Sequence, residues 1–135
     1  MADLQDYLKQ LEQLDYSKLY DSDFFLTWEK TLDELKAIFT AADALRYLRS
    51  HNISTKQFDS GLGISLFRDN STRTRFSFAS ACNLLGLEVQ DLDEGKSQIA
   101  HGETVRETAN MISFMADVIG IRDDMYIGKG NAYMH

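Results

Sequence analysis

The order of short apolar runs and helical patterns in the second half of the chain constrains its fold more than any other feature. Residues 62–67 and 117–121 are short apolar runs of the kind found in buried strands, and residues 87–92 alternate as a strand does. Helical patterns separate them at residues 76–85 and 104–116. A strand–helix–strand–helix–strand order implies right-handed crossovers and a parallel sheet. We therefore predict an α/β fold, a parallel sheet with flanking helices.

Helices are also predicted before the sheet. Asp3 is a plausible N-cap for a first helix, and Thr31 and Glu34 form a capping box for a second. The apolar stripe of the first helix consists of Leu4, Leu8, Leu11 and Leu14, and that of the second consists of Leu35, Ile38, Phe39, Ala42, Leu45 and Leu48. Both stripes predict packing rather than chemistry. We expect residues 1–26 to form an N-terminal helical extension.

Charge and cysteine content exclude several classes of protein. The 135 residues carry a net charge of -7, and the acidic excess extends over both halves, which argues against nucleic-acid binding through a broad basic face. Cys82 is the one cysteine, so a reducing compartment is favoured, and the apolar runs are too short to cross a membrane. We expect a cytoplasmic protein with neither nucleic acid nor membrane as its partner.

The stretch Ser71-Thr72-Arg73-Thr74-Arg75 follows the first predicted strand and opens a helix. Free backbone N–H groups and the helix dipole at such a position favour an anion, hydroxyls add donors, and an arginine can grip phosphate oxygens with two prongs. The alternative is a Ser/Thr-rich helix cap with surface arginines. Capping needs one hydroxyl rather than three, so the sequence favours an anion site.

Other chemistries lack the spacing that they require. Gly95-Lys96-Ser97 resembles the end of a Walker A loop, but Gln90 occupies the place of its first glycine. Three scattered histidines and one cysteine give no metal-ligand spacing. Cys82 lies in the middle of a helical pattern, which indicates a buried, inert thiol. We expect no metal and no cofactor.

Three segments in order carry a resemblance to a known family. The pentapeptide from Ser71 to Arg75, His101-Gly-Glu-Thr104 at a helix start, and Val118-Ile-Gly-Ile-Arg122 at a strand end resemble the carbamoyl-phosphate half of the aspartate/ornithine carbamoyltransferases. More narrowly, the chain is similar to the YgeW-type members of that family. The resemblance implies the fold of the carbamoyl-phosphate-binding domain, over residues 27–135.

The resemblance also implies roles for individual residues. Four of them would hold the phosphate group of carbamoyl phosphate, namely Ser71, Thr72, Arg73 and Thr74. Arg122 and Thr74 would contact the carbamoyl oxygen, and Arg73 would offset charge on the departing phosphate. The catalytic set is then Arg73, Thr74 and Arg122. Arg75 is interpreted as a structural ion-pair partner.

The family pattern further implies assembly and a missing part. In these enzymes the catalytic unit is a trimer, and the loop that here carries Ser97 and His101 reaches a neighbouring subunit's site; a solvated loop histidine is the alternative for His101. The H-P-x-Q segment and the second, amine-binding domain are absent, so the carbamoyl-phosphate-binding domain is expected to be incomplete at its C-terminus. The sequence thus predicts part of an enzyme that transfers a carbamoyl group to an amine acceptor. The rival is a truncated, non-catalytic phosphate-binding or oligomerisation module.

Overall fold

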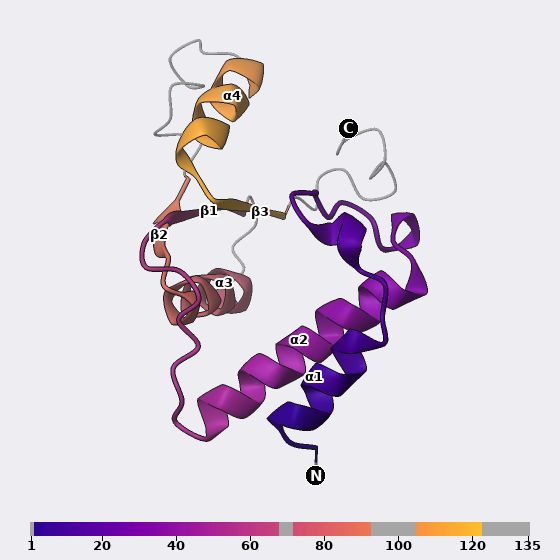
Figure 1. Ribbon diagram of the computed structural model, residues 1–135. Coiled ribbons are helices and arrows are strands. Elements are labelled where there is room, and N and C mark those ends of the chain that lie inside the picture. The colour runs from indigo at the N-terminus through magenta and orange to yellow at the C-terminus, as the bar shows by residue number, and fades with distance from the viewer. Residues whose placement is uncertain (1, 68–71, 93–104, 123–135) are drawn as a thin grey trace. The chain divides into compact units, whose positions relative to one another are not determined.

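The computed structural model describes residues 2–67, 72–92 and 105–122. Contacts within the chain divide the described residues into two compact units. The boundary along the chain falls between Thr55 and Lys56. The first unit is helical and the second contains the sheet (Figure 1).

The first unit holds the two predicted N-terminal helices, α1 (Leu4–Glu12) and α2 (Leu32–Ser50), which lie alongside each other (Figure 1). Both begin with a reciprocal capping box: Asp3 with Asp6 for α1, and Thr31 with Glu34 for α2. Each box satisfies backbone N–H groups that a helix start leaves without a partner. Short 3₁₀ turns form between the helices, η1 (Ser17–Leu19) and η2 (Thr27–Glu29).

The buried face of α2 differs from the predicted apolar stripe. Its buried residues include Ala37, Thr40 and Ala44, whereas Phe39 from the predicted stripe is 67% exposed. Small side chains at these spacings allow a neighbouring helix to approach closely. The periodicity of large apolar residues therefore located the helix and several half-buried positions such as Ile38 and Leu45, but not its most buried ones.

The second unit contains the predicted parallel sheet, with strands β1 (Leu62–Phe67), β2 (Glu88–Asp91) and β3 (Val118–Arg122) in the order β2-β1-β3. Helix α3 (Thr72–Leu85) connects β1 to β2, and α4 (Val105–Met115) precedes β3. Because β2 and β3 flank β1 on opposite sides, right-handed crossovers put the two helices on opposite faces (Figure 1). The α/β fold class is confirmed.

Helix α3 packs closely on the sheet because two strand positions are glycine. A Cβ atom at Gly63 would lie 2.8 Å from the Cys82 Sγ atom, and one at Gly120 would lie 2.6 Å from the Phe78 ring. Phe78 also meets Phe67 edge to face, with ring centroids 5.7 Å apart. The core of this unit forms around these contacts, and its buried apolar residues include Ile64, Phe67, Cys82 and Leu87.

Helix α3 starts four residues earlier than the apolar pattern predicts, at Thr72. It ends where expected, because Gly86 takes a φ of 103° and a Cβ atom there would lie 1.9 Å from the Phe58 carbonyl oxygen. The periodicity of the helix at residues 104–116 predicts an inward face of Val105, Ala109, Ile112 and Met115 or Ala116, and this prediction is only partly right for α4. Ala109 and Met115 are exposed and Ile112 is half-buried, since no described element of this unit covers that face.

Candidate functional site

The carboxyl ends of the three strands meet at one edge of the sheet. Phe67 at the end of β1 is the register partner of Arg122 at the end of β3, and Ser65 is the partner of Asp91 at the end of β2. Since the strands are parallel, side chains from all three ends lie beside the start of α3. Such an edge is where open α/β sheets bind ligands.

A hydrogen bond joins the strand-end arginine to the motif. Arg122 Nη1 donates to Thr74 Oγ1 over 2.8 Å. Arg122 is exposed and Thr74 is half-buried, so the pair lies at the surface of this edge. Two of the three predicted catalytic residues are thus in direct contact although 48 positions separate them.

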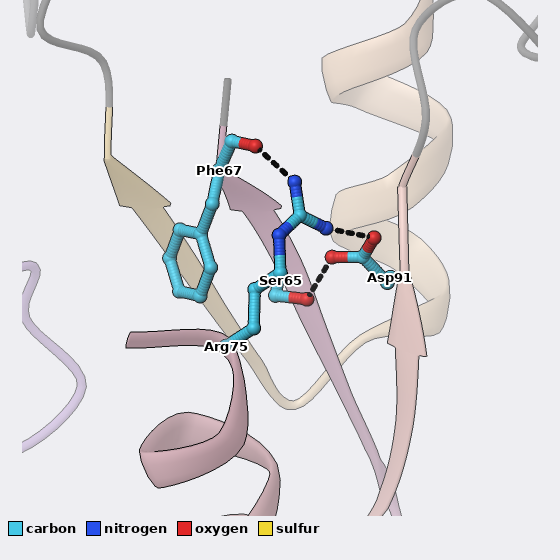
Figure 2. Close-up of polar contacts among 4 residues, drawn as sticks. All are labelled: Ser65, Phe67, Arg75 and Asp91. Atoms are coloured by element: carbon cyan, nitrogen blue, oxygen red, sulfur yellow. Dashed lines mark hydrogen bonds and ion pairs between the residues drawn. The ribbon is translucent and has the colours of Figure 1, made fainter. Parts of the chain in front are cut away.

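The next residue of α3, Arg75, is bound to the other two strand ends (Figure 2). Its guanidinium forms an ion pair with the Asp91 carboxylate and donates over 2.6 Å to the Phe67 carbonyl oxygen. The second Asp91 oxygen accepts a hydrogen bond of 2.7 Å from the Ser65 hydroxyl. Arg75 therefore forms the ion pair that the sequence led us to expect.

The remaining predicted site residues divide into described and undescribed ones. Thr72 and Arg73 lie exposed in the first turn of α3. Ser71, Ser97 and His101 lie outside the described residues. The structure therefore brings Thr72, Arg73, Thr74 and Arg122 to one place, and these four carry the chemistry considered below.

This arrangement suits an anion. The start of α3 presents the positive end of a helix dipole, and Arg73 and Arg122 add two exposed cations beside it. Arg75 also lies in this first turn, and its charge is paired with that of Asp91. Two arginines with a hydroxyl between them can neutralise an oxyanion and donate hydrogen bonds to it.

Sequence reasoning assigned no role to Asp91 or to Ser65. Asp91 was counted only as a position in an alternating strand, and Ser65 only as part of an apolar run. The available signal was an acidic residue in the predicted strand that runs to residue 92, because the carboxyl ends of parallel strands line the ligand edge. A small hydroxyl residue inside an otherwise apolar strand was the second signal.

Three further features were considered among the described residues: a buried thiol, possible metal ligands and possible membrane-spanning helices. Cys82 is 4% exposed, and its burial raises the pKa of the thiol, which opposes nucleophilic reactivity. Residues 2–67, 72–92 and 105–122 contain no group of three or more His, Cys, Asp or Glu side chains able to hold a metal ion. None of the helices described is both long and apolar enough to cross a bilayer.

A pocket of about 370 Å³ lies in the helical unit, between α1 and α2. Its walls include Leu14, Phe39 and Thr40, with Lys36 and Asp43 as the charged residues. None of the predicted site residues lines it, so it is separate from the strand-end site.

Comparison with known proteins decides the family. Residues 23–133 match the model of the carbamoyl-P binding domain of aspartate/ornithine carbamoyltransferases. The chain belongs to the aspartate/ornithine carbamoyltransferase family. It is 69% identical over 134 residues to the Escherichia coli K12 protein named "Putative carbamoyltransferase YgeW", an alignment that covers 99% of this chain and 34% of that protein.

More distant family members match as well. The ornithine carbamoyltransferase of Prochlorococcus marinus strain MIT 9312 is 34% identical over 106 residues, covering 78% of this chain and 33% of that enzyme. The chain thus spans about a third of the length of the curated relatives that it matches. The resemblance to this family and to its YgeW-type members is confirmed.

Solved structures of the family agree with the fold. The aspartate transcarbamoylase of Trypanosoma cruzi in complex with carbamoyl phosphate matches with a TM-score of 0.72 at 22% identity, over 80% of this chain and 34% of that one. The catalytic subunit of M. jannaschii aspartate transcarbamoylase matches with a TM-score of 0.68 at 28% identity, over 82% of this chain and 36% of that one. The carbamoyltransferase form of the α/β fold is therefore confirmed.

Proposed function

We propose that this chain provides the carbamoyl-phosphate site of an enzyme that transfers the carbamoyl group to the amino group of an amino-acid-like acceptor. The observation that carries the proposal is the hydrogen bond from Arg122 to Thr74, which joins the strand-end arginine to the motif in a member of this family. Arg122 and Thr74 are the two residues expected to hold the carbamoyl oxygen, and they lie close enough together to contact the same oxygen atom.

In the proposed reaction, the amine nitrogen attacks the carbamoyl carbon. A C–N bond forms, the bond from that carbon to the phosphate oxygen breaks, and the proton that the amine loses passes to the departing phosphate. Arg122 and Thr74 stabilise the negative charge that develops on the carbamoyl oxygen. Arg73, with Ser71 and Thr72, holds the phosphate and offsets the charge that accumulates on it. Orientation and fixed charge supply the catalysis.

The rest of the enzyme is part of the same proposal. The carbamoyl-phosphate domain covers residues 27–135 with an N-terminal extension at 1–26, and a further domain binds the acceptor. Ser97 and His101 act in the site of a neighbouring subunit of a homotrimer or a multiple of trimers, in the cytoplasm. The family match and the share of the relatives that the chain spans support this division. The 135 residues alone bind carbamoyl phosphate and do not transfer its carbamoyl group.

Calorimetry with carbamoyl phosphate and with inorganic phosphate tests the proposal. The protein should bind carbamoyl phosphate more tightly, and Arg73→Ala should remove that preference. Arg49→Ala, at an exposed position of α2, is the matched control and should leave both affinities unchanged. Equal affinity for the two ligands in the unmodified protein would favour the rival, a generic phosphate-binding module. Carbamoyl transfer by the 135 residues alone would contradict the need for a further domain.

A further inference from the structure

The four polar groups of Figure 2 form a chain of contacts that starts in the core and ends at the motif. Ser65 is 3% exposed, and its hydroxyl donates to Asp91 over 2.7 Å. Asp91 pairs with Arg75, and Arg75 reaches the Phe67 carbonyl oxygen over 2.6 Å. A buried residue of β1 thus fixes the carboxylate that holds the arginine.

An isolated ion pair at this level of exposure would have little effect. The Arg75 and Asp91 side chains are 33% and 45% exposed, and water and salt screen such pairs. Here both partners are held on their other sides, Asp91 by Ser65 and Arg75 by the end of β1. This restraint reduces the rotamer freedom that an exposed pair must otherwise lose.

The position of Arg75 on α3 gives the contacts a consequence for the site. Arg75 directly follows Arg73 and Thr74 in the first turn of the helix, and Arg122 holds Thr74 from the side of β3. Since β2 and β3 lie on opposite sides of β1, the first turn is attached to the sheet on both sides. Shifting Arg75 would therefore shift the two residues that face the ligand.

We propose that Asp91, held by Ser65, is a positioning residue that fixes Arg75 and thereby orients Arg73 and Thr74 toward carbamoyl phosphate. This inference rests on the proposed function for its ligand. Asp91 does not contact the ligand itself and acts through the first turn of α3. An error of about 1 Å in the placement of such groups is enough to lower affinity and rate severely.

The first test is carbamoyl phosphate affinity, measured by calorimetry on the full chain. Asp91→Asn should raise the Kd about tenfold or more, as expected when a charge-assisted hydrogen bond is lost. Arg75→Lys keeps the charge but lacks the planar guanidinium that binds two acceptors at once. Its Kd should therefore lie between that of the unmodified protein and that of Arg75→Met. Asp43→Asn, which removes the exposed Arg46–Asp43 pair of α2, is the matched control and should leave the Kd within about twofold.

A second readout needs no ligand. Amide hydrogen exchange in Asp91→Asn should quicken at the first hydrogen-bonded amides of α3, residues 76–78, while β1 keeps its protection. If carbamoyl phosphate fails to bind the unmodified protein, the proposed function fails, but this exchange measurement still tests the positioning role. Unchanged exchange at residues 76–78 overturns the positioning role whatever the ligand.

The positioning role of Asp91 can still be tested if the Asp91→Asn variant does not fold. Ser65→Ala removes one contact to Asp91 and keeps the ion pair, so it should raise the Kd less than Asp91→Asn does. Ser77→Ala, which removes an exposed hydroxyl bonded to the Thr74 carbonyl oxygen, is its control on the same helix. Affinities of Ser65→Ala and Arg75→Lys that match the unmodified protein would overturn the proposal even if Asp91→Asn does not fold.

Discussion

Arg122 at the end of β3 donates a hydrogen bond to the Thr74 hydroxyl at the start of α3, over 2.8 Å. The sequence motif and the last described strand are thereby joined at one edge of the sheet. The same first turn of α3 is held from the other side of β1 by the ion pair of Arg75 with Asp91.

The first prediction concerns that hydroxyl. Thr74→Val keeps the shape of the side chain but removes the acceptor for Arg122 and the donor for the ligand. We expect carbamoyl phosphate affinity to fall about tenfold or more, because a hydrogen bond between a neutral and a charged group is lost. Calorimetry measures this, and Thr74→Ser, which retains the hydroxyl, should stay near the unmodified value. Equal affinities in the valine and serine variants would contradict the role of the hydroxyl.

The second prediction concerns the close approach of α3 to β1. Gly63→Ala places a methyl group 2.8 Å from the Cys82 sulfur and should lower the free energy of unfolding by about 1–3 kcal/mol. Cys82→Ala in the same chain should restore part of this loss, which denaturant titration can measure. Gly120→Ala, which meets the Phe78 ring instead, is the control, since Cys82→Ala should not rescue it. Strictly additive effects in the Gly63 double variant would exclude the proposed clash.

The third prediction concerns the buried thiol. Burial raises the pKa of Cys82, so its thiolate is disfavoured in the folded state. The stabilisation is fully present below the thiol pKa of the unfolded chain and is lost as the pH rises toward the higher, folded pKa. The unfolding free energy should therefore fall less steeply above about pH 8.5 in Cys82→Ala than in the unmodified protein. In the native protein, rapid reaction of the thiol with an aromatic disulfide reagent at neutral pH would show that the group is not buried.

The fourth prediction concerns the capping box of α2. The Thr31 backbone N–H donates to Glu34 over 2.7 Å, and this hydrogen bond lowers the pKa of the Glu34 carboxyl. A depressed folded pKa contributes stability above the unfolded value, and this contribution is lost as the pH falls through the folded value. The protein should therefore lose less stability below about pH 4.5 in the Glu34→Gln variant than in its unmodified form. Thermal unfolding at a series of pH values measures this difference. Glu12→Gln, at the exposed end of α1, controls for removing one carboxylate.

Local signals predicted the elements of this chain well. The N-cap Asp3 marked the start of α1, and the capping box of Thr31 and Glu34 marked that of α2. Gly86 marked the end of α3, because only a residue without Cβ fits beside Phe58. The parallel sheet followed from the alternation of strands and helices. Since the carboxyl ends of parallel strands share one edge of a sheet, that topology alone predicts that the motif and Arg122 lie at the same edge.

Predictions failed where distant partners decide the outcome. The most buried positions of α2 include the small residues Ala37 and Ala44, whereas Phe39 of the predicted stripe is exposed. The start of α3 lies four residues before its apolar pattern, within a hydroxyl- and arginine-rich stretch whose helical propensity is modest. The role of Asp91 could not be predicted, because its partner Arg75 is 16 positions away in the sequence. Only the strand order β2-β1-β3 makes the two residues neighbours.

The strand order also sets a sequence of events during synthesis. The contact of α3 with β2 joins Arg75 and Asp91, which are 16 positions apart in the sequence. Its contact with β3 joins Thr74 and Arg122, which are 48 positions apart. Because the chain emerges from the ribosome N-terminus first, Asp91 becomes available to Arg75 before Arg122 becomes available to Thr74. The contact of the strand-end arginine is therefore the later of the two that the order of synthesis allows.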